Sequence, residues 1–519
     1  MRTQFKVGFL TAAAVLMSIA AHGQCPDRPA SGSVVADAPS LMSQNGTLSA
    51  TFTMAQSVDV YGYTHYCYKY ASGNQIIEAP TLRLNPGDKL GLNVVNQNNP
   101  QESGMKMDMS QTGMPVCGDT GAATVSSTNV HFHGMNVPPK CHQDDVITTL
   151  IQPGSPGFEY EMQIPSDEPP GLYWYHPHIH GFTEFQVNGG AAGALIVEGM
   201  EKFRPEVTGL AERVFVIRQQ FLVPWVPGPY ELTVNYQVAP FIGTMPIIQM
   251  KPGERQFWRV ANATLQDFLQ LQFVVNGQPE QMEMIALDGY PLSKTRMQNS
   301  IFIPPAGRAE FIVQAPATGG TASFTTESVS TGPTGNFDQG QTLAKIQLTD
   351  NAIGWHASSA PASDSSRLKF SNLADQPVTA TRKLYFSEEF GGTNGPIQFY
   401  ITVDGQKQKV FEPNEPPAIV TKVGAVEDWT IENRALETHA FHIHQIHFKL
   451  LEVDGQPAPN QDLLDTVEIP YWEGNGHPYH TVKVRMDFRD PNTAGTFVFH
   501  CHILLHEDLG MMHKILVEP

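Results

Sequence analysis

The sequence is poor in charged residues and especially in cations. Charged side chains make up 16% of the 519 residues, against about 25% in an ordinary soluble protein. Lys and Arg number 32 against 51 Asp and Glu, for a formal net charge of -19, and no Lys/Arg-rich run occurs. We therefore expect no nucleic-acid partner, because phosphate binding needs a concentrated positive surface. Long apolar runs are also lacking beyond the N-terminus, so we expect no membrane span.

The first 24 residues have the pattern of a signal peptide. Arg2 and Lys6 precede an apolar run at 7–20, and residues that suit signal-peptidase cleavage follow at 21–23. The run is shorter than the ~20 residues of a membrane-spanning helix, which favours cleavage over the alternative of an uncleaved anchor. We therefore predict a periplasmic or secreted protein.

Cysteine is scarce, with five residues in the whole chain. Four of them lie in the first third, at Cys25, Cys67, Cys117 and Cys141. In an oxidising compartment these four can form two disulfides, and the sequence does not choose among the three possible pairings. Cys501 stands alone near the C-terminus and requires a different explanation.

Glycine and proline are abundant, at 44 and 40 residues, which is typical of many short strands joined by turns. One pattern occurs three times at a spacing of about 170 residues, which is the period of a whole domain. A glycine is followed nine residues later by an asparagine, with alternating apolar residues between them, at 86–96, 252–262 and 423–433. Alternation with period two marks a strand with one buried face. We therefore predict an all-β protein of three tandem β-sandwich domains.

The domain boundaries follow from a second repeated segment that closes each unit. It begins with glycine and occurs at 171–175, 320–324 and 495–499. A Ser/Ala/Pro-rich stretch at 358–366 has the composition of a linker. The predicted domains cover residues 25–200, 201–365 and 366–519.

Ten of the nineteen histidines fall in four short segments. Residues i and i+2 of a strand point to the same face, so each His-x-His pair can present two imidazoles to one metal cluster. A single pair arises readily by coincidence, whereas four pairs on apolar strands do not. The segments are His131-Phe132-His133-Gly134, His176-Pro177-His178, His439 to His444, and His500-Cys501-His502 followed by His506 and Met511.

The last of these segments predicts two metal sites on one strand. If the imidazoles of His500 and His502 point to one side, the Cys501 thiol points to the other. Cys501 with His439, His506 and Met511 then forms a His₂Cys set with a weak axial thioether, the ligand set of a blue electron-transfer copper. Zinc is the alternative metal, but structural zinc sites usually contain several thiolates, and zinc would leave eight further histidines unexplained.

The eight remaining imidazoles come in equal numbers from the first and third predicted domains, so we expect them to form a cluster at the interface of these domains. Imidazole suits copper, and eight ligands fit three coppers if two ions take three imidazoles and one takes two. With the blue site this makes four ions, which matches the four electrons that dioxygen accepts on reduction to water. The eight are His131, His133, His176, His178, His442, His444, His500 and His502.

On these four segments, in this order, the sequence resembles the three-domain multicopper oxidases, the family that includes laccases and bacterial cuprous oxidases. The resemblance implies a cupredoxin-like Greek-key sandwich for each domain. It implies a type 1 copper held by His439, Cys501, His506 and Met511, and a type 2 copper held by His131 and His442. It implies a type 3 pair, one ion held by His133, His176 and His502 and the other by His178, His444 and His500. Ala440 and Gln445 stand where family members commonly have proline and glycine, which puts the packing around the ligands in question rather than copper binding.

Two carboxylates and a group of methionines are further candidates. Family members carry an acid near the type 2 copper that assists proton delivery, and Asp144 is the best match, with Asp145 as its rival and a solvated turn as the alternative. Glu507, next to a type 1 ligand, is a candidate for a proton path or a surface acid. Thioethers favour cuprous ion, so a loop with four methionines is either a cuprous relay or incidental: Met105, Met107, Met109 and Met114.

The predicted function is oxidation of a small-molecule or metal-ion donor with dioxygen as acceptor, by a monomer. Laccase-like oxidation of phenols or aromatic amines is favoured, and a cuprous or ferrous metallo-oxidase is the alternative. A non-catalytic copper-binding cupredoxin protein is the rival class, which the loss of any cluster ligand would favour, and none is lost. In the second domain Thr325-Thr326-Glu327 occupies the place of His500-Cys501-His502, so we predict no copper there.

Overall fold

The computed structural model describes residues 24–100, 107–108, 117–220, 230–350, 352, 355–356, 368–390 and 397–519. The predicted signal peptide up to residue 23, the predicted linker at 358–366, and Met105, Met109 and Met114 lie outside these residues. Within the described part no helix is long and apolar enough to cross a membrane.

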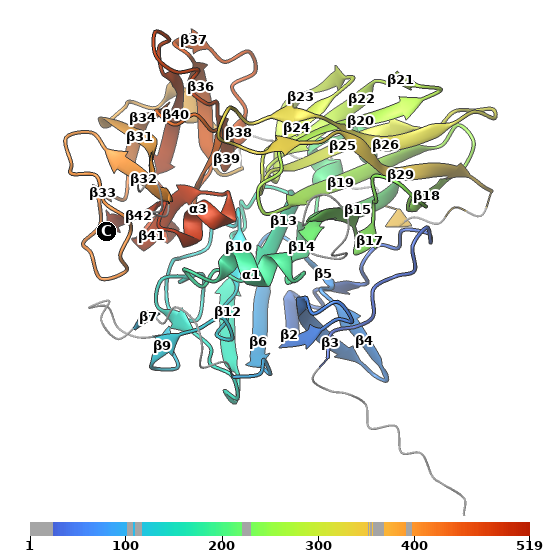
Figure 1. Ribbon diagram of the computed structural model, residues 1–519, viewed down its shortest axis with the longest axis horizontal. Coiled ribbons are helices and arrows are strands. Elements are labelled where there is room, and N and C mark those ends of the chain that lie inside the picture. Colours follow the sequence, from blue (N-terminus) through green and yellow to red (C-terminus); the bar gives the residue numbers. More distant parts are fainter. Residues whose placement is uncertain are drawn as a thin grey trace, which may run out of the picture.

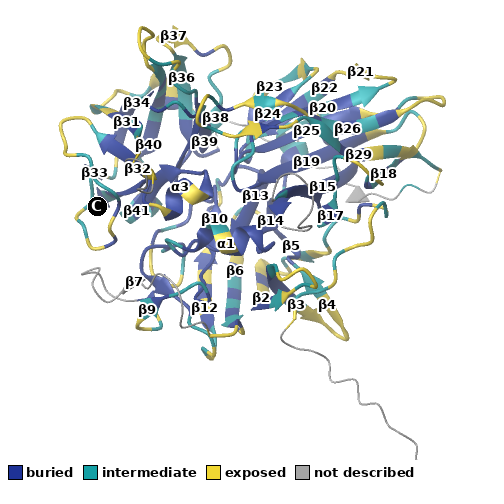
Figure 2. Cartoon of the chain, in the orientation of Figure 1, coloured by how far each residue is buried: buried dark blue, intermediate teal, exposed yellow. Residues whose placement is uncertain are grey.

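The strands form three pairs of sheets in chain order, which appear as three bodies in Figure 1. This confirms the prediction of an all-β protein with three cupredoxin-like sandwiches. Each pair has its own buried hydrophobic core, visible as dark ribbon in Figure 2. The boundaries at residues 200 and 365 stay a prediction.

The first sandwich consists of two five-stranded sheets. One has the order β1 (Ser40–Met42), β5 (Thr81–Leu84), β14 (Gly193–Val197), β13 (Gly171–His176) and β10 (His131–His133). The other has the order β12 (Phe158–Gln163), β6 (Lys89–Asn96), β2 (Thr47–Val58), β3 (Thr64–Ser72) and β4 (Gln75–Glu78). Short ribbons pair β8 (Cys117–Gly118) with β11 (Thr149–Leu150) and β7 (Met107–Asp108) with β9 (Ala122–Ala123).

The second sandwich has an eight-stranded and a six-stranded sheet. The first has the order β17 (Gln237–Val238), β16 (Glu231–Val234), β15 (Ala211–Gln220), β19 (Arg255–Ala263), β25 (Arg308–Gln314), β22 (Met282–Leu287) and β23 (Tyr290–Gln298), with β30 (Trp355–His356) beside β15. The second has the order β18 (Ile247–Met250), β29 (Gln341–Leu348), β26 (Ala322–Glu327), β20 (Leu269–Val275) and β21 (Gln278–Pro279), with β24 (Ile301–Ile303) beside β20. A ribbon pairs β27 (Val329–Ser330) with β28 (Phe337–Asp338).

The third sandwich has a seven-stranded and a five-stranded sheet. The first has the order β32 (Ile397–Val403), β31 (Ala380–Phe390), β34 (Ala425–Asn433), β40 (His480–Phe488), β36 (Phe448–Val453) and β37 (Gln456–Pro457), with β38 (Leu463–Leu464) beside β36. The second has the order β33 (Ile419–Lys422), β42 (Met512–Glu518), β41 (Gly495–Cys501), β35 (His439–Ile443) and β39 (Thr466–Ile469). Within the described residues of the chain the α-helices are α1 (Thr183–Asn188), α2 (Met200–Phe203) and α3 (Leu504–Asp508), and short 3-10 turns lie at Pro205–Val207, Leu373–Asp375 and Pro491–Thr493.

The repeated asparagine has the same task in every domain. The predicted strands are β6, β19 and β34, and each carries the asparagine at or next to its C-terminal end. The buried side-chain amide of Asn96 donates to the carbonyls of Ser126 and Ile151, which lie in two different loops. Asn262 likewise donates to three loop or strand-end carbonyls and Asn433 to two. The asparagine therefore recurs because its buried amide needs hydrogen-bond partners, and the carbonyls it binds join separate segments at the edge of each sandwich.

The cysteines of the first domain form two disulfides, Cys25 with Cys67 and Cys117 with Cys141. These resolve the pairing that the sequence left open. Among the described cysteines, Cys501 remains free and is buried.

Candidate metal centre

Two antiparallel strand pairs assemble the histidine segments. In the first domain β10 pairs with β13, which sets His131 opposite His176. In the third domain β35 pairs with β41, which sets His442 opposite His500. The rings from the two domains then meet, with His131 stacked on His444 at a centroid distance of 3.9 Å. The eight imidazoles therefore lie together between the first and third domains, where the sequence predicts a cluster.

Within the cluster the ring nitrogens form three compact groups. The Nε2 atom of His500 lies 3.4 Å from that of His178 and 3.2 Å from that of His444. In each group the potential ligand atoms lie within 4.8 Å of one another, and all these residues are buried. The groups are His131 with His133 and His442, His133 with His176 and His502, and His178 with His444 and His500.

The hydrogen bonds of the rings show that this cluster fits metal ions. His131 Nδ1 donates to the Asp144 carboxylate at 3.0 Å, and His176 Nδ1 donates to the Pro177 carbonyl at 2.9 Å. In both rings Nε2 is buried and has no hydrogen-bond partner among the described residues. An unpaired buried polar atom costs about 1–3 kcal/mol, whereas a metal-binding imidazole characteristically donates its other N–H to such an acceptor.

The protonation state of the rings also suits metal binding. Burial lowers the pKa of His176 to about 3 and that of His500 to about 4. Burial, together with the neighbouring imidazoles, lowers the pKa of His131 well below its ordinary value. The rings are therefore neutral at physiological pH, which is the form that binds a metal ion.

A second, separate group lies on the other side of β41. Cys501 Sγ is 3.6 Å from His439 Nδ1 and 3.9 Å from His506 Nδ1, and the two nitrogens are 3.3 Å apart. Met511 is fully buried. Two backbone hydrogen bonds hold it next to this group: its N–H donates to the His506 carbonyl, and its carbonyl accepts from the Cys501 N–H. Phe399 stacks on the His506 ring at a centroid distance of 4.0 Å. Burial raises the pKa of the Cys501 thiol, so a bound metal ion is what would hold it as thiolate.

The structure distinguishes the two candidate aspartates. Asp144 is buried, and both of its oxygens lie 3.0 Å from His131 Nδ1. Asp145 instead accepts from the backbone N–H groups of Ile147 and Thr148 and so closes its own turn. Gln445, which stands where the family resemblance leads us to expect glycine, has a positive φ of 60° and donates to Asp144 Oδ2 at 2.5 Å. Burial raises the pKa of Asp144 to about 8.

Glu507 is a buried acid rather than a surface one. It lies on α3, with Oε1 at 3.5 Å from His178 Nδ1 and Oε2 at 3.5 Å from His500 Nδ1. The hydroxyl of Thr183 on α1 donates to Oε1 at 3.0 Å. Burial, and next the neighbouring Asp508, raise the pKa of Glu507 well above its ordinary value. Glu507 thus bridges one histidine from each domain.

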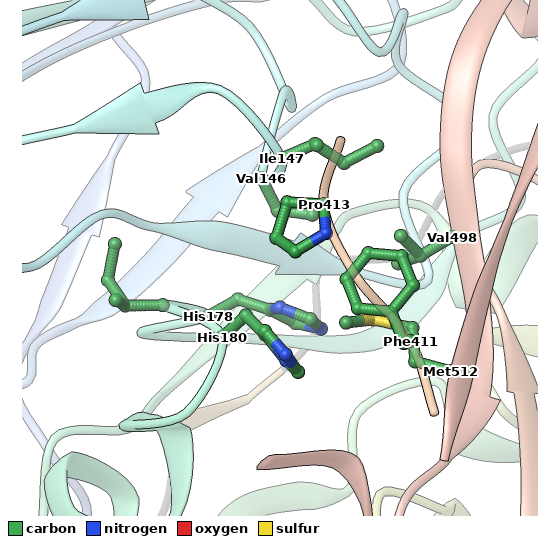
Figure 3. A pocket seen from close by; sticks show the side chains of 9 residues that line it. Val146, Ile147, His178, His180, Phe411, Pro413, Val498 and Met512 are labelled. Atoms are coloured by element: carbon green, nitrogen blue, oxygen red, sulfur yellow. The ribbon is translucent and has the colours of Figure 1, made fainter. Parts of the chain in front are cut away.

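A small apolar cavity of about 20 Å³ adjoins the cluster at His178 (Figure 3). The rings of His178 and His180 extend from the first domain towards Phe411 and Met512 of the third. This volume suffices for about one water molecule.

Three acidic residues near the histidines escaped the sequence analysis. Asp465 Oδ1 lies 3.3 Å from His133 Nε2. Glu388 Oε1 lies 3.4 Å from His439 Nε2, and Glu437 Oε2 lies 3.8 Å from His506 Nε2. Of the three, only Glu437 could have been noticed from the sequence, since it lies two residues before His439.

Comparison with known proteins agrees with the site. Three family models, each described as multicopper oxidase, match residues 122–202, 217–350 and 391–519, which together are about two thirds of the chain. A multicopper oxidase named mco from Staphylococcus aureus is 25% identical over 455 residues, which cover 84% of this chain and 81% of that protein. A laccase from Bacillus subtilis (strain 168) is 23% identical, over 75% of this chain and 79% of that protein.

Solved structures show the same fold along almost the whole chain. A multicopper oxidase from Campylobacter jejuni, described as a metallo-oxidase, superposes with a TM-score of 0.68 at 24% identity and covers 95% of this chain and 96% of that one. The McoA multicopper oxidase from Aquifex aeolicus superposes with a TM-score of 0.65 at 18% identity and covers 95% of this chain and 100% of that one.

Proposed function

The chain belongs to the multicopper oxidase family of copper-dependent oxidoreductases, and on that premise we propose that it couples the one-electron oxidation of a reducing substrate to the four-electron reduction of dioxygen to water. One observation carries the proposal. Cys501 lies in the His439–His506 group while its chain neighbours His500 and His502 lie in the histidine cluster. One short backbone segment therefore joins a site that suits electron entry to a site that suits dioxygen.

The residues that would hold four copper ions are those that the family resemblance implies. Bound copper would supply one-electron redox chemistry and, at the cluster, dioxygen reduction. The proposed type 1 ligands are His439, Cys501, His506 and Met511. The proposed type 2 ligands are His131 and His442, and the type 3 ligands are His133, His176 and His502 on one ion and His178, His444 and His500 on the other.

The buried carboxylates are proposed to hold and move the protons that water formation consumes. Asp144 is placed at His131, and Glu507 is placed between His178 and His500. The Glu507 carboxyl is also hydrogen-bonded to the hydroxyl of Thr183, which gives it a partner on the side away from the cluster. Both carboxyl groups are buried beside the cluster, so each would hold a proton close to where water forms.

Copper-loaded protein should consume about one dioxygen for every four molecules of a phenol oxidised, without accumulating hydrogen peroxide. An oxygen electrode with a peroxide assay measures this ratio, and protein freed of copper with a chelator is the control. Copper binding without oxygen uptake would instead support the rival class, a cupredoxin protein that binds copper without turnover.

We propose laccase-like oxidation of phenols or aromatic amines, with a cuprous or ferrous donor as the second candidate. Glu388 and Glu437 favour the second. They lie at the Nε2 atoms of His439 and His506, the ring edges that face away from Cys501. The Glu388 side chain is only 4% exposed, and its Oε1 has no hydrogen-bond partner among the described residues. Burial, and next the charge of Glu388, raise the pKa of Glu437 to about 8, a cost that a bound cation would relieve.

The double variant Glu388→Gln/Glu437→Gln should raise the KM for cuprous or ferrous ion about tenfold or more, which is about 1.4 kcal/mol, and change the KM for a neutral phenol less than about twofold. Loss of two carboxylates removes attraction for a cation but leaves an uncharged ring unaffected. Steady-state rates on both donors test this. Glu389→Gln, on the same strand with its carboxylate on Gln408, is the matched control. An equal rise for both donors would show that the pair shapes the site without selecting cations.

The protein is proposed to be periplasmic or secreted and to act as a monomer. The two disulfides support an oxidising compartment. A single chain brings together every proposed histidine and cysteine ligand of copper, so one copy suffices for the site.

A further inference from the structure

An arginine of the second domain reaches the histidine cluster through an aspartate of the third. Arg308, the first residue of β25, is fully buried, and its Nη1 and Nη2 donate to the two oxygens of Asp465 at 2.7 and 2.5 Å. Asp465 immediately precedes β39 and is also fully buried. Paired parallel bonds of this kind fix both the position and the plane of a carboxylate.

Asp465 in turn contacts two histidines of the cluster, one from the first domain and one from its own domain. Its Oδ1 lies 3.3 Å from His133 Nε2, and its backbone carbonyl accepts from His442 Nδ1 at 2.8 Å. His133 Nδ1 is buried and has no hydrogen-bond partner in the described part of the chain. His133 therefore turns Nδ1 towards the cluster, whereas His131 and His176 turn Nε2. An ionised acceptor at Nε2 selects this tautomer and ring orientation.

Gly134, in the first histidine segment, is shaped around this ion pair. Its φ is +85°, and a Cβ there would lie 2.5 Å from Arg308 Nη2 and 2.6 Å from Asp465 Oδ2. Real Cβ atoms do not approach other atoms so closely, so any side chain would push the ion pair away from His133. The glycine thus supports the same arrangement by an observation that is independent of the hydrogen bonds.

Asp288, also from the second domain, braces the segment that carries Asp465. Its Oδ1 accepts from the Arg308 N–H at 2.8 Å, and its Oδ2 accepts from the N–H groups of Asp465 and Thr466 at 3.2 and 3.3 Å. The backbone of Asp465 is therefore held from the same domain that holds its side chain.

From these contacts we infer that the second domain, which supplies none of the proposed copper ligands, positions the histidine cluster through Arg308 and Asp465. Arg308 fixes the Asp465 carboxylate, and Asp465 fixes the rings of His133 and His442. Arg308 and Asp465 are positioning residues, since they act through the imidazoles. The inference rests on the proposed function only for the identity of the copper ligands.

The test replaces Arg308 by lysine, which keeps the charge but loses the two-pronged contact. The copper affinity of the cluster should fall about 10- to 100-fold, as is usual when the partner of a metal-bound histidine is lost. The type 2 electron paramagnetic resonance signal should change, while the blue type 1 absorption stays. Asp465→Asn and Gly134→Ala should give the same pattern. Copper titration of the apoprotein, copper content and the resonance spectrum are measured on the full chain.

Arg259→Lys is the matched control, because Arg259 is another buried arginine of the second domain and pairs with Glu212 and Glu310. It should lower the melting temperature of the apoprotein without changing cluster affinity or the type 2 signal. Equal effects of Arg308→Lys and Arg259→Lys would overturn the inference, as would unchanged copper binding in all three test variants. If Arg308→Lys does not fold, Gly134→Ala and Asp465→Asn decide the matter by the same measurements.

Failure of the proposed function gives a different result. Wild-type protein would then bind copper at the cluster without reducing dioxygen, and the variants would still change cluster affinity if Arg308 and Asp465 position it. Absence of copper from the wild-type cluster would overturn both proposals.

Discussion

Replacing Cys501 by serine should abolish the blue colour of the copper-loaded protein while leaving most of the copper bound. The Cys501 sulfur lies 3.6 Å from His439 Nδ1, in the group apart from the histidine cluster. Intense blue absorption comes from a thiolate bond to copper, and a serine hydroxyl offers neither sulfur nor an anion at neutral pH. Visible absorption should lose nearly all of its intensity, and total copper should fall by about a quarter.

Met512→Leu is the matched control for this variant. Met512 is a buried sulfur residue that pairs with His500 across β41 and β42, but it is outside the proposed ligand set. The control should keep its colour and its copper. A blue band that persists in the Cys501→Ser protein would contradict the assignment of Cys501, and loss of all copper would show that the two sites do not form independently.

The strands were predictable because the information that forms them is local. Apolar residues alternate between the repeated glycine and asparagine, and this pattern predicts β6, β19 and β34 without reference to any other part of the chain. Histidines two residues apart on a strand share a face, so the convergence of the imidazoles followed once their segments were taken as strands. The disulfide pairing was open, because it depends on which loops meet in space, and Cys25 meets Cys67 only in the folded first domain.

The acids around the histidines were harder to predict, because their contacts are long-range. Asp465 contacts His133, a residue more than 300 positions earlier, and it does so only because an arginine from a third region holds it. No spacing in the sequence encodes such a contact. Asp144 and Asp145 are neighbours in the chain but make different contacts. The Asp145 carboxylate accepts hydrogen bonds from the backbone of its own turn, whereas the Asp144 carboxylate faces His131.

Replacing His502 by alanine should leave a blue protein that a reductant bleaches but that air reoxidises very slowly. His502 is fully buried, its ring lies 5.1 Å from that of His133, and neither of its nitrogens has a hydrogen-bond partner among the described residues. Its loss removes one end of the covalent path that leads from the Cys501 sulfur through the backbone to the cluster. Turnover should fall at least about a thousandfold, which is about 4 kcal/mol on the activation barrier.

Stopped-flow absorption of the blue band measures reduction and reoxidation separately, and so distinguishes a lost oxygen site from a lost electron entry. His513→Ala is the matched control, because His513 is a buried histidine on the neighbouring strand, paired with Phe499, and is not a proposed ligand. The control should reoxidise at the wild-type rate. Normal reoxidation of His502→Ala would mean that dioxygen is reduced elsewhere. The backbone from Cys501 to His502 would then not be the path that carries electrons to dioxygen.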